Sequence, residues 1–395
     1  MDLRALTPLL AAPGPFATVY LATHRASEQA AAAFDVLWKD VHRELADAGA
    51  DAATIDALDA ARGSHTDGGT IALVAAGGRV LLRQALPAAS DTTLVRVAPL
   101  PHLLPLLGWA QSRVPHVVAL VDHSGGDVLA YSAELTAGNA PVDAGTVPAA
   151  DGPAHKTGGG GYNEKRNQRT VENSWEETAH RVVAAVQAAS AEVGAQVVLL
   201  GGDAREVGLL REALPHDLAP LVAVVKGGRA ADGGAAHLAD EILAALDARI
   251  AADTTDVLDR FATYRGRASK DRARPIVTGQ TADGADEHEP ALQAADGVAD
   301  VVAALRMGAV DTVLLAVGAD EDRTVLTGPD PLQLALTDAE LADLGVPAPV
   351  EALLVDALAR AALAQDATLR LVPAGVPDAP ADGVGALLRY SLPAA

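Results

Sequence analysis

Cysteine is absent from this chain of 395 residues. Its absence excludes disulfide bonds, zinc sites with cysteine ligands, cysteine-bound iron–sulfur clusters and thiol nucleophiles. Aromatic residues are also scarce, at 3%, although half of the residues are hydrophobic. The cores must therefore be packed mainly from alanine, valine and leucine side chains.

Long hydrophobic runs are missing as well. No stretch approaches the roughly 18 uninterrupted apolar residues that a membrane-spanning helix needs. Residues 1–16, MDLRALTPLLAAPGPF, contain neither the basic start nor the apolar run of a secretory signal peptide. We therefore expect a soluble, cytoplasmic protein that has no membrane partner.

Positive charge is in short supply. The chain has 30 Lys and Arg residues against 52 Asp and Glu residues, a net charge of −22. A surface this acidic repels phosphate backbones at long range, which disfavours nucleic acids, DNA above all, as partners. The argument sums charge over the whole surface, however, so a local basic segment can still bind RNA.

The length of the chain predicts two to three domains, at roughly 100–200 residues each. Residues 1–111 are predicted to form an N-terminal α/β domain, with helices at 28–46 and 51–61. Ala31, Phe34, Leu37, Val41 and Leu45 are predicted on the buried face of the first helix. The strands are expected at 17–21, 70–75, 79–86 and 94–98, and a short helix at 103–109.

Residues 112–265 are predicted to form a middle domain. Strands at 114–121 and 128–135 read as a hairpin, and residues 136–151 as an extended connection. A long helix is expected to begin at about Asn163 or Thr170 and to end at Val193. Strands and helices alternate after it, which predicts a mixed sheet covered by helices, in an RNase H-like arrangement.

Residues 266–395 are predicted to form a third, small α/β domain. A polar linker or exposed loop is expected at 266–289, before the first helix of this domain at 299–305. Strands at 312–316, 368–372 and 385–390 alternate with a helix at 350–364. All three domains are therefore expected to belong to the α/β class.

One stretch combines conformational freedom, positive charge and a strongly patterned helix. Four consecutive glycines favour a loop that moves or that brings backbone N–H groups close to phosphate. Cations flank these glycines, and neighbouring rings could stack on bases. The candidate RNA-binding residues are His155, Lys156, Gly158, Gly159, Gly160, Gly161, Tyr162, Asn163, Lys165, Arg166 and Arg169.

If the helix begins near Asn163, Lys165 and Arg166 lie one turn from Arg169 on one face. The alternative is a solvated surface loop before an ordinary helix start. The glycines do not form a nucleotide-binding P-loop, because Gly161 is followed by Tyr-Asn-Glu. The segment GGDAREVG at 201–208 reads as a strand-to-helix turn with Asp203 as N-cap, and we expect no cofactor.

Acidic residues offer a second interpretation of the middle domain. A nuclease of the RNase H type needs several carboxylates gathered around metal ions, and Asp122, Glu177 and Asp203 are the candidates. Acidic residues are abundant along the whole chain, so we expect no metal site. The same holds for the run Asp-Glu-His-Glu at 286–289, which we predict to be a solvated linker.

The segment at 155–186, HKTGGGGYNEKRNQRTVENSWEETAHRVVAAV, resembles the middle domain of the archaeal and eukaryotic release factor and Pelota superfamily. In that superfamily a basic glycine-rich loop precedes a basic helix. The segments ALRMGAVDTVLLA, ATLRLVP and GVGALLRY, at 304–316, 367–373 and 383–390, resemble its third domain. The bacterial branch that includes the ribosome hibernation factor Balon and its mycobacterial homologues is the most similar.

This resemblance implies a ribosome-associated factor with the shape of tRNA. It would bind the A site of idle 70S ribosomes in stress or dormancy, with the glycine loop directed to the peptidyl-transferase centre. The first domain would face the decoding centre, and the third could contact a translational GTPase such as EF-Tu.

Release factors carry Gly-Gly-Gln, whose glutamine positions the water that attacks peptidyl-tRNA. Here Tyr162 and Asn163 follow the glycines, and the nearest glutamine is Gln168. We therefore expect no hydrolysis of peptidyl-tRNA. The alternatives are a ribosome-rescue peptidyl-tRNA hydrolase, an RNase H-like nuclease, and an interaction module without ribosome contact.

Overall fold

The computed structural model of the chain describes residues 6–10, 12–23, 30–63, 69–86, 93–134, 140–150, 164–229, 235–272, 291–318 and 322–393. Contacts divide the chain into two compact units. The first combines residues 1–111 with residues 254–395, and the second consists of residues 112–253. The mixture of helices with several sheets confirms the predicted α/β class, whereas the predicted boundaries of three domains stay a prediction.

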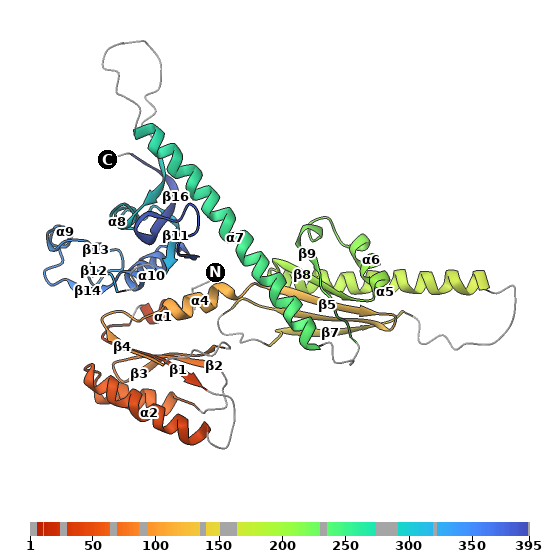
Figure 1. The fold of residues 1–395 in the computed structure, drawn as a ribbon, viewed down its shortest axis with the longest axis horizontal. Helices are drawn as coiled ribbons and strands as arrows, with labels where there is room; N and C mark the ends of the chain where they lie inside the picture. Colours follow the sequence, from red (N-terminus) through yellow and green to blue (C-terminus); the bar gives the residue numbers. More distant parts are fainter. Residues whose placement is uncertain are drawn as a thin grey trace, which may run out of the picture. The chain divides into compact units, whose positions relative to one another are not determined.

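The N-terminal part of the first unit is a four-stranded antiparallel sheet in the order β3-β2-β1-β4 (Figure 1). Gly77 and Gly78 join β2 to β3 with positive φ angles of 55° and 71°, which glycine adopts without strain. Phe34, Trp38 and Leu58 bury one face of the sheet under two helices. The elements are α1 (Thr7–Leu10), β1 (Phe16–Thr23), α2 (Ala30–Asp47), α3 (Ala52–Ala61), β2 (Gly69–Ala76), β3 (Arg79–Leu86), β4 (Leu94–Ala98) and α4 (Leu104–Ser112).

The C-terminal part of the first unit contains two further sheets. The larger has the order β10-β16-β11-β15, in which β11 and β15 run parallel, and the smaller has the order β13-β12-β14. Helix α10 packs against strands of both. The elements are β10 (Ala291–Asp296), α8 (Val298–Arg306), β11 (Val310–Val317), β12 (Thr324–Thr327), β13 (Leu334–Ala335), α9 (Asp338–Asp343), β14 (Val350–Leu353), α10 (Leu354–Ala364), β15 (Thr368–Pro373) and β16 (Val384–Pro393).

Buried polar contacts join these two parts of the first unit. Asp356 on α10 is 2% exposed and accepts hydrogen bonds from Leu103 N at 3.0 Å and from His102 Nδ1 at 3.1 Å. The Tyr20 hydroxyl donates a hydrogen bond to the backbone carbonyl oxygen of His102. The backbone N–H of His102 donates to Thr18 Oγ1 on β1. A second bridge runs between the Gln111 amide and the backbone N–H and C=O of Leu371, at 2.8 and 2.7 Å. We call these contacts the joint.

The second unit contains a five-stranded sheet in the order β7-β6-β5-β8-β9. Strands β5, β6 and β7 are antiparallel neighbours, while β8 and β9 run parallel to β5. This is the predicted mixed sheet of RNase H-like type. The elements are β5 (His116–Asp122), β6 (Gly125–Tyr131), β7 (Asp143–Pro148), α5 (Glu164–Val193), β8 (Val197–Gly202), α6 (Ala204–Ala213) and β9 (Val222–Val224), together with the first half of α7 (Ala235–Arg272).

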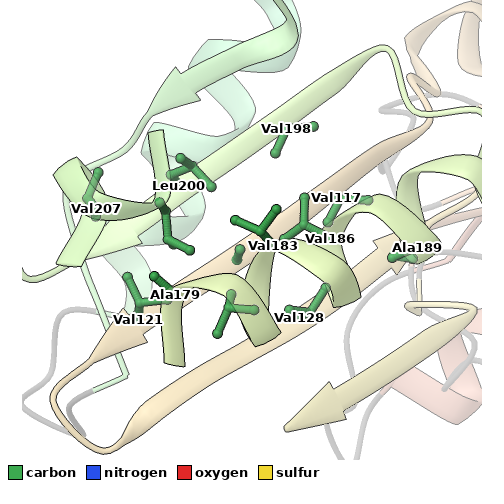
Figure 2. Close-up of a cluster of buried hydrophobic side chains, with 14 residues drawn as sticks. Val117, Val121, Val128, Ala179, Val183, Val186, Ala189, Val198, Leu200 and Val207 are labelled. Atoms are coloured by element: carbon green, nitrogen blue, oxygen red, sulfur yellow. The ribbon is translucent and has the colours of Figure 1, made fainter. Parts of the chain in front are cut away.

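One hydrophobic cluster of the second unit lies between α5 and the sheet, and another joins Val118 and Leu199 of the sheet to Leu246 of α7. Figure 2 shows Ala179, Val183 and Val186 of α5 facing Val117 and Val128 of the strands. These side chains are almost completely buried, and none of them is aromatic. The scarcity of aromatic residues is thus met by close packing of valine and alanine, as the composition predicts.

Four local predictions were wrong. Ala31 is exposed and does not belong to the buried face of α2, although Phe34, Val41 and Leu45 of the same predicted face are buried. The connection at 136–151 contains β7, an exposed edge strand that pairs with β6. Residues 266–272 are the last turns of α7 instead of a linker. The helix predicted at 350–364 begins only at Leu354, because residues 350–353 pair with β12 as β14.

Among the helices that the structure describes, none is long and apolar enough to cross a membrane.

Candidate functional site

Helix α5 carries the described part of the predicted RNA-binding segment. It begins at Glu164, next to Asn163, the first of the two starts that the sequence leaves open, and runs for 30 residues. Among the residues of α5 whose side chains the structure describes, from Glu176 on, the buried ones include Ala179, Val182, Val186 and Ser190. In Figure 1 the first turns of α5 run past the ends of the strands. The backbone positions of the basic residues therefore lie on the part of the helix farthest from its packed half.

The three helical candidates are Lys165, Arg166 and Arg169, in the first two turns of α5. At 100° per residue, their backbone positions fall within an arc of about 100°. This agrees with the prediction that they share one face. Their side chains, and the other candidates His155, Lys156, Gly158, Gly159, Gly160, Gly161, Tyr162 and Asn163, lie outside the described residues, so their binding role stays a prediction.

The acidic residues that were candidates for a nuclease site do not form one site in the structure. Asp203 caps α6, because its side chain accepts a hydrogen bond from Arg205 N at 2.9 Å. Glu177 is exposed on α5. Within the described ranges, no group of three or more His, Asp or Glu side chains is placed to hold a metal ion. The run at 286–289 lies outside those ranges.

Asp122 instead belongs to an arginine-centred cluster at the β5–β6 turn, which sequence reasoning missed. Arg229 Nε donates to Asp127 Oδ2 at 2.8 Å, and its NH1 donates to Asp122 Oδ1 and Ser124 Oγ, each at 2.9 Å. We call this group the Arg229 clip. Arg229 lies 102 to 107 residues after the other members in the sequence, and the parallel pairing of β8 with β5 and with β9 brings it to the β5–β6 turn.

The clip lowers the pKa of both carboxyl groups. For Asp127, the hydrogen bond from Arg229 is the largest cause and outweighs the opposing effect of partial burial. For Asp122, partial burial would raise the pKa, but hydrogen bonds from Ser124 and the charge of Arg229 together lower it. Both carboxylates are therefore held in the charged form and bound to the protein's own cation.

A small hollow lies beside this cluster, between the β5–β6 turn, α5 and α6. Its polar lining includes His123, Thr178 and Glu206. Burial raises the pKa of the Glu206 carboxyl, and a hydrogen bond with Asp203 adds to the effect. Glu206 Oε2 is buried without a hydrogen-bond partner among the described residues. The spacing of Asp203 and Glu206, which matches a capping box, was the sequence signal for this pair.

The turn at 201–208 is a strand-to-helix turn, as predicted. Gly202 has a φ of 128°, and a Cβ there would lie 1.8 Å from the carbonyl oxygen of Val121. Only glycine therefore allows β8 to end this close to β5. Asp203 N donates to the same Val121 carbonyl oxygen, at 3.2 Å.

Comparison with known proteins gives matches to one family model and to two relatives. Residues 115–267 match the model of bacterial archaeo-eukaryotic release factor family 2. The Mycobacterium tuberculosis proteins Rv2629 (strain H37Rv) and MT2704 (strain CDC 1551), both uncharacterized, are 31% identical over 392 residues. The match covers 97% of this chain and 95% of each relative.

Two solved structures are similar at lower identity. Dom34 of S. cerevisiae, a translation termination-like factor involved in RNA quality control pathways and interacting with Hbs1, is 11% identical with a TM-score of 0.38. That match covers 78% of this chain and 75% of Dom34. Archaeal Pelota, from a model of ribosome-bound Pelota and ABCE1, is 12% identical with a TM-score of 0.33, over 97% and 92%.

Proposed function

The chain belongs to bacterial archaeo-eukaryotic release factor family 2, within the release factor and Pelota superfamily, and from this membership we propose that it is a cytoplasmic, ribosome-associated factor. It binds the A site of idle 70S ribosomes and protects them during stress or dormancy. Its glycine loop is directed to the peptidyl-transferase centre, where it contacts rRNA.

The observation that carries this proposal is the start of α5. Three cations, Lys165, Arg166 and Arg169, follow four glycines within a chain of net charge −22. All of them lie inside residues 115–267, the range that matches the release factor family. Such a local group of cations attracts phosphate groups even though the rest of the acidic surface repels them. The segment is thus suited to RNA in the position where the superfamily keeps its basic loop and helix.

The proposed role does not include hydrolysis. The superfamily's release factors use the glutamine of Gly-Gly-Gln, whereas Tyr162 and Asn163 follow the glycines here. Ribosomal complexes loaded with labelled peptidyl-tRNA are expected to show no release above background. Release that disappears in Asn163→Ala would contradict this part of the proposal and favour a ribosome-rescue hydrolase.

The predicted first and third domains would make the remaining contacts of an A-site factor. In this proposal residues 1–111 face the decoding centre, and residues 266–395 contact a translational GTPase such as EF-Tu. Support comes from the superfamily membership and from the length of the mycobacterial match, which covers both blocks.

Ribosome binding is tested by sedimentation of the full chain with 70S ribosomes from stationary-phase cells at low salt. We expect co-sedimentation with empty ribosomes and competition by tRNA in the A site. Lys165→Gln/Arg166→Gln/Arg169→Gln should weaken binding about tenfold, since phosphate contacts dominate such affinities.

The matched control removes three cations from exposed sites elsewhere: Arg211→Gln/Lys226→Gln/Arg260→Gln. Both triple variants change the net charge from −22 to −25, that is by −3. The control should sediment as the unmodified chain does. Absence of the unmodified chain from ribosomal fractions, or equal loss in both variants, would overturn the proposal.

A further inference from the structure

A hollow in the first unit lies at the carboxyl end of β11. Leu315, Ala316 and Val317, the last residues of this strand, line one wall. After β11 the chain passes through the small sheet and α10 and returns in β15, parallel to β11. Ligands of α/β sheets commonly bind outside the carboxyl ends of parallel strands, at the start of the connecting helix. The hollow occupies this place, and its other walls include the start of α10 and Leu104 of α4.

Helix α10 begins at this hollow without a side-chain cap. Leu353 occupies the N-cap position, and a leucine side chain cannot accept a hydrogen bond from the N–H groups of the first turn. Leu354 and Val355, the first two residues of the helix, line the hollow. The N–H of Leu354 donates to the carbonyl oxygen of Arg323 at 2.7 Å, whereas the N–H of Val355 has no acceptor within the helix. The helix start therefore favours a negatively charged group in the hollow.

Asp356, the acidic residue in the first turn of α10, does not supply that group. Its carboxylate oxygens accept hydrogen bonds from Leu103 N and His102 Nδ1 in the joint, and Asp356 is not among the residues that line the hollow. The joint thus holds this carboxylate away from the place that a capping side chain would fill.

Two side chains of opposite charge line the hollow, Arg323 and Asp382. Arg323 is half-buried, while Asp382, on the short helical turn η4 (Ala381–Gly383), is exposed. Among the residues that the structure describes, neither of them forms an ion pair, with the other or with a third residue. A half-buried guanidinium has lost part of its hydration, so an anion that accepts its hydrogen bonds is favoured. The two charges make the hollow complementary to a ligand that carries both a negative and a positive group.

Apolar side chains form most of the remaining lining. Leu315 and Leu354 are 5% and 6% exposed, and they favour an aliphatic part of a ligand over a hydrated one. A phosphate dianion suits the hollow less well, because Arg323 is its one cationic lining residue and Asp382 would repel the second charge. Charge and apolar lining together indicate a small zwitterion with an aliphatic side chain.

We propose that this hollow binds a free α-amino acid with a small aliphatic side chain. The carboxylate of the amino acid accepts hydrogen bonds from the Arg323 guanidinium and from the N–H of Val355. Its ammonium group donates to the Asp382 carboxylate, and its side chain lies on Leu104 and Leu315. The ligand then contacts both parts of the first unit beside the joint, since Leu104 follows a residue of the joint. This binding does not depend on the proposed ribosome binding.

Isothermal titration calorimetry of the full chain with L-alanine, L-valine and L-leucine tests the binding. We expect saturable one-to-one binding of at least one of them. Isovalerate lacks the ammonium group of valine, and isobutylamine lacks its carboxylate. Each should bind at least about tenfold more weakly than valine, because each loses a hydrogen bond to a charged group. Inorganic phosphate should not compete with valine.

Two variants locate the site. Arg323→Gln and Asp382→Asn each remove one charge and keep a similar shape, and asparagine tolerates the positive φ of 53° at this position. Each should weaken amino-acid binding at least about tenfold. The matched controls Arg79→Gln and Asp343→Asn remove the same charges at exposed positions of the same unit and should bind as the unmodified chain does. Urea denaturation without ligand verifies that each variant is folded.

The outcomes decide both the site and the class of ligand. Absence of saturable binding for all three amino acids overturns the inference. Equal affinity for valine and isovalerate overturns the assignment of a zwitterion. Unchanged affinity in Arg323→Gln and Asp382→Asn overturns the site, and if one of these variants is unfolded, the other decides. Sedimentation with ribosomes tests the proposed function separately, so the failure of one leaves the other standing.

Discussion

Carboxylates link distant segments in both units of the chain, but under opposite conditions of exposure. In the joint, Asp356 and His102 are 2% and 7% exposed, and the two residues are 254 positions apart. In the Arg229 clip, Asp122 and Asp127 are 31% and 34% exposed, and Arg229 is 17% exposed. The contacts have similar lengths, from 2.8 to 3.1 Å.

The clip and the joint differ in what happens to the remaining groups when one partner of a pair is removed. Water can reach the clip, so a freed carboxylate is solvated again and the net worth of the pair is small. Water cannot easily reach the joint, so a freed His102 ring and Leu103 N–H stay buried without a partner. Contact distance therefore says little about the energy of these bridges, whereas burial says much. The predicted consequences are ordered accordingly.

Removal of the Asp356 side chain should have the largest effect. Asp356→Ala leaves two buried donors without an acceptor, which we expect to cost about 3–5 kcal/mol in the free energy of unfolding. Asp356→Asn should cost less, since its amide oxygen can still accept the Leu103 N–H. Urea denaturation of the full chain measures both variants. Equal stability of Asp356→Ala and the unmodified chain would contradict the conclusion that the buried joint stabilises the fold more than the clip does.

Removal of the clip should have a smaller effect. Arg229→Ala is expected to cost about 1 kcal/mol at pH 7, because the pairs are partly solvated. The clip lowers the pKa of Asp122 and Asp127 in the folded state, so its contribution is present above the unfolded pKa of about 3.9. It is lost as the pH falls through the folded values.

The difference between Arg229→Ala and the unmodified chain should therefore shrink below about pH 4. Thermal denaturation followed from pH 7 to pH 2.5 measures it. Arg211→Ala, an exposed arginine on α6 of the same unit, serves as control and should change little. A cost for Arg229→Ala that persists unchanged at pH 2.5 would contradict this account of the clip.

His116 on β5 should give the smallest effect, with a different pH dependence. Burial lowers the pKa of its ring, which stacks on Tyr131 at 4.5 Å and bonds the Val114 carbonyl oxygen at 2.7 Å. The unfolded state then binds a proton more readily, so stability falls as the pH drops below about 6.5. His116→Phe keeps the stack and should flatten this part of the pH profile, which denaturation between pH 7.5 and 5 would reveal.

Strong local patterns explain which parts of the fold were predictable. The apolar spacing of Val182 and Val186 predicts the long helix, and Gly77-Gly78 predicts the β2–β3 hairpin; both are confirmed. β7 was missed because its exposed residues have no alternating pattern, and pairing with β6 alone makes it a strand. β14 was absorbed into a helix for the same reason, since its partner β12 is distant in the sequence.

Part of the candidate site was likewise predictable from the sequence, and part was not. The charge reversal near Lys165 is visible in the sequence because it depends only on composition over a few residues. The clip was invisible, because nothing near Arg229 in the chain marks it as the partner of Asp122 and Asp127. Long-range pairs of charges follow from sheet order, which no local pattern specifies.

The sequence by itself determined the α/β class, most helices and strands, and the segment near Lys165 where an acidic chain turns basic. These follow from hydrophobic periodicity, turn residues and local charge, all of which act within a few residues. Only the tertiary structure decided that residues 1–111 and 254–395 form one unit. Asp356 of α10 meets His102, which Thr18 and Tyr20 of β1 hold in place, only in the folded chain. Their hydrogen bond is stronger there because burial excludes water from it.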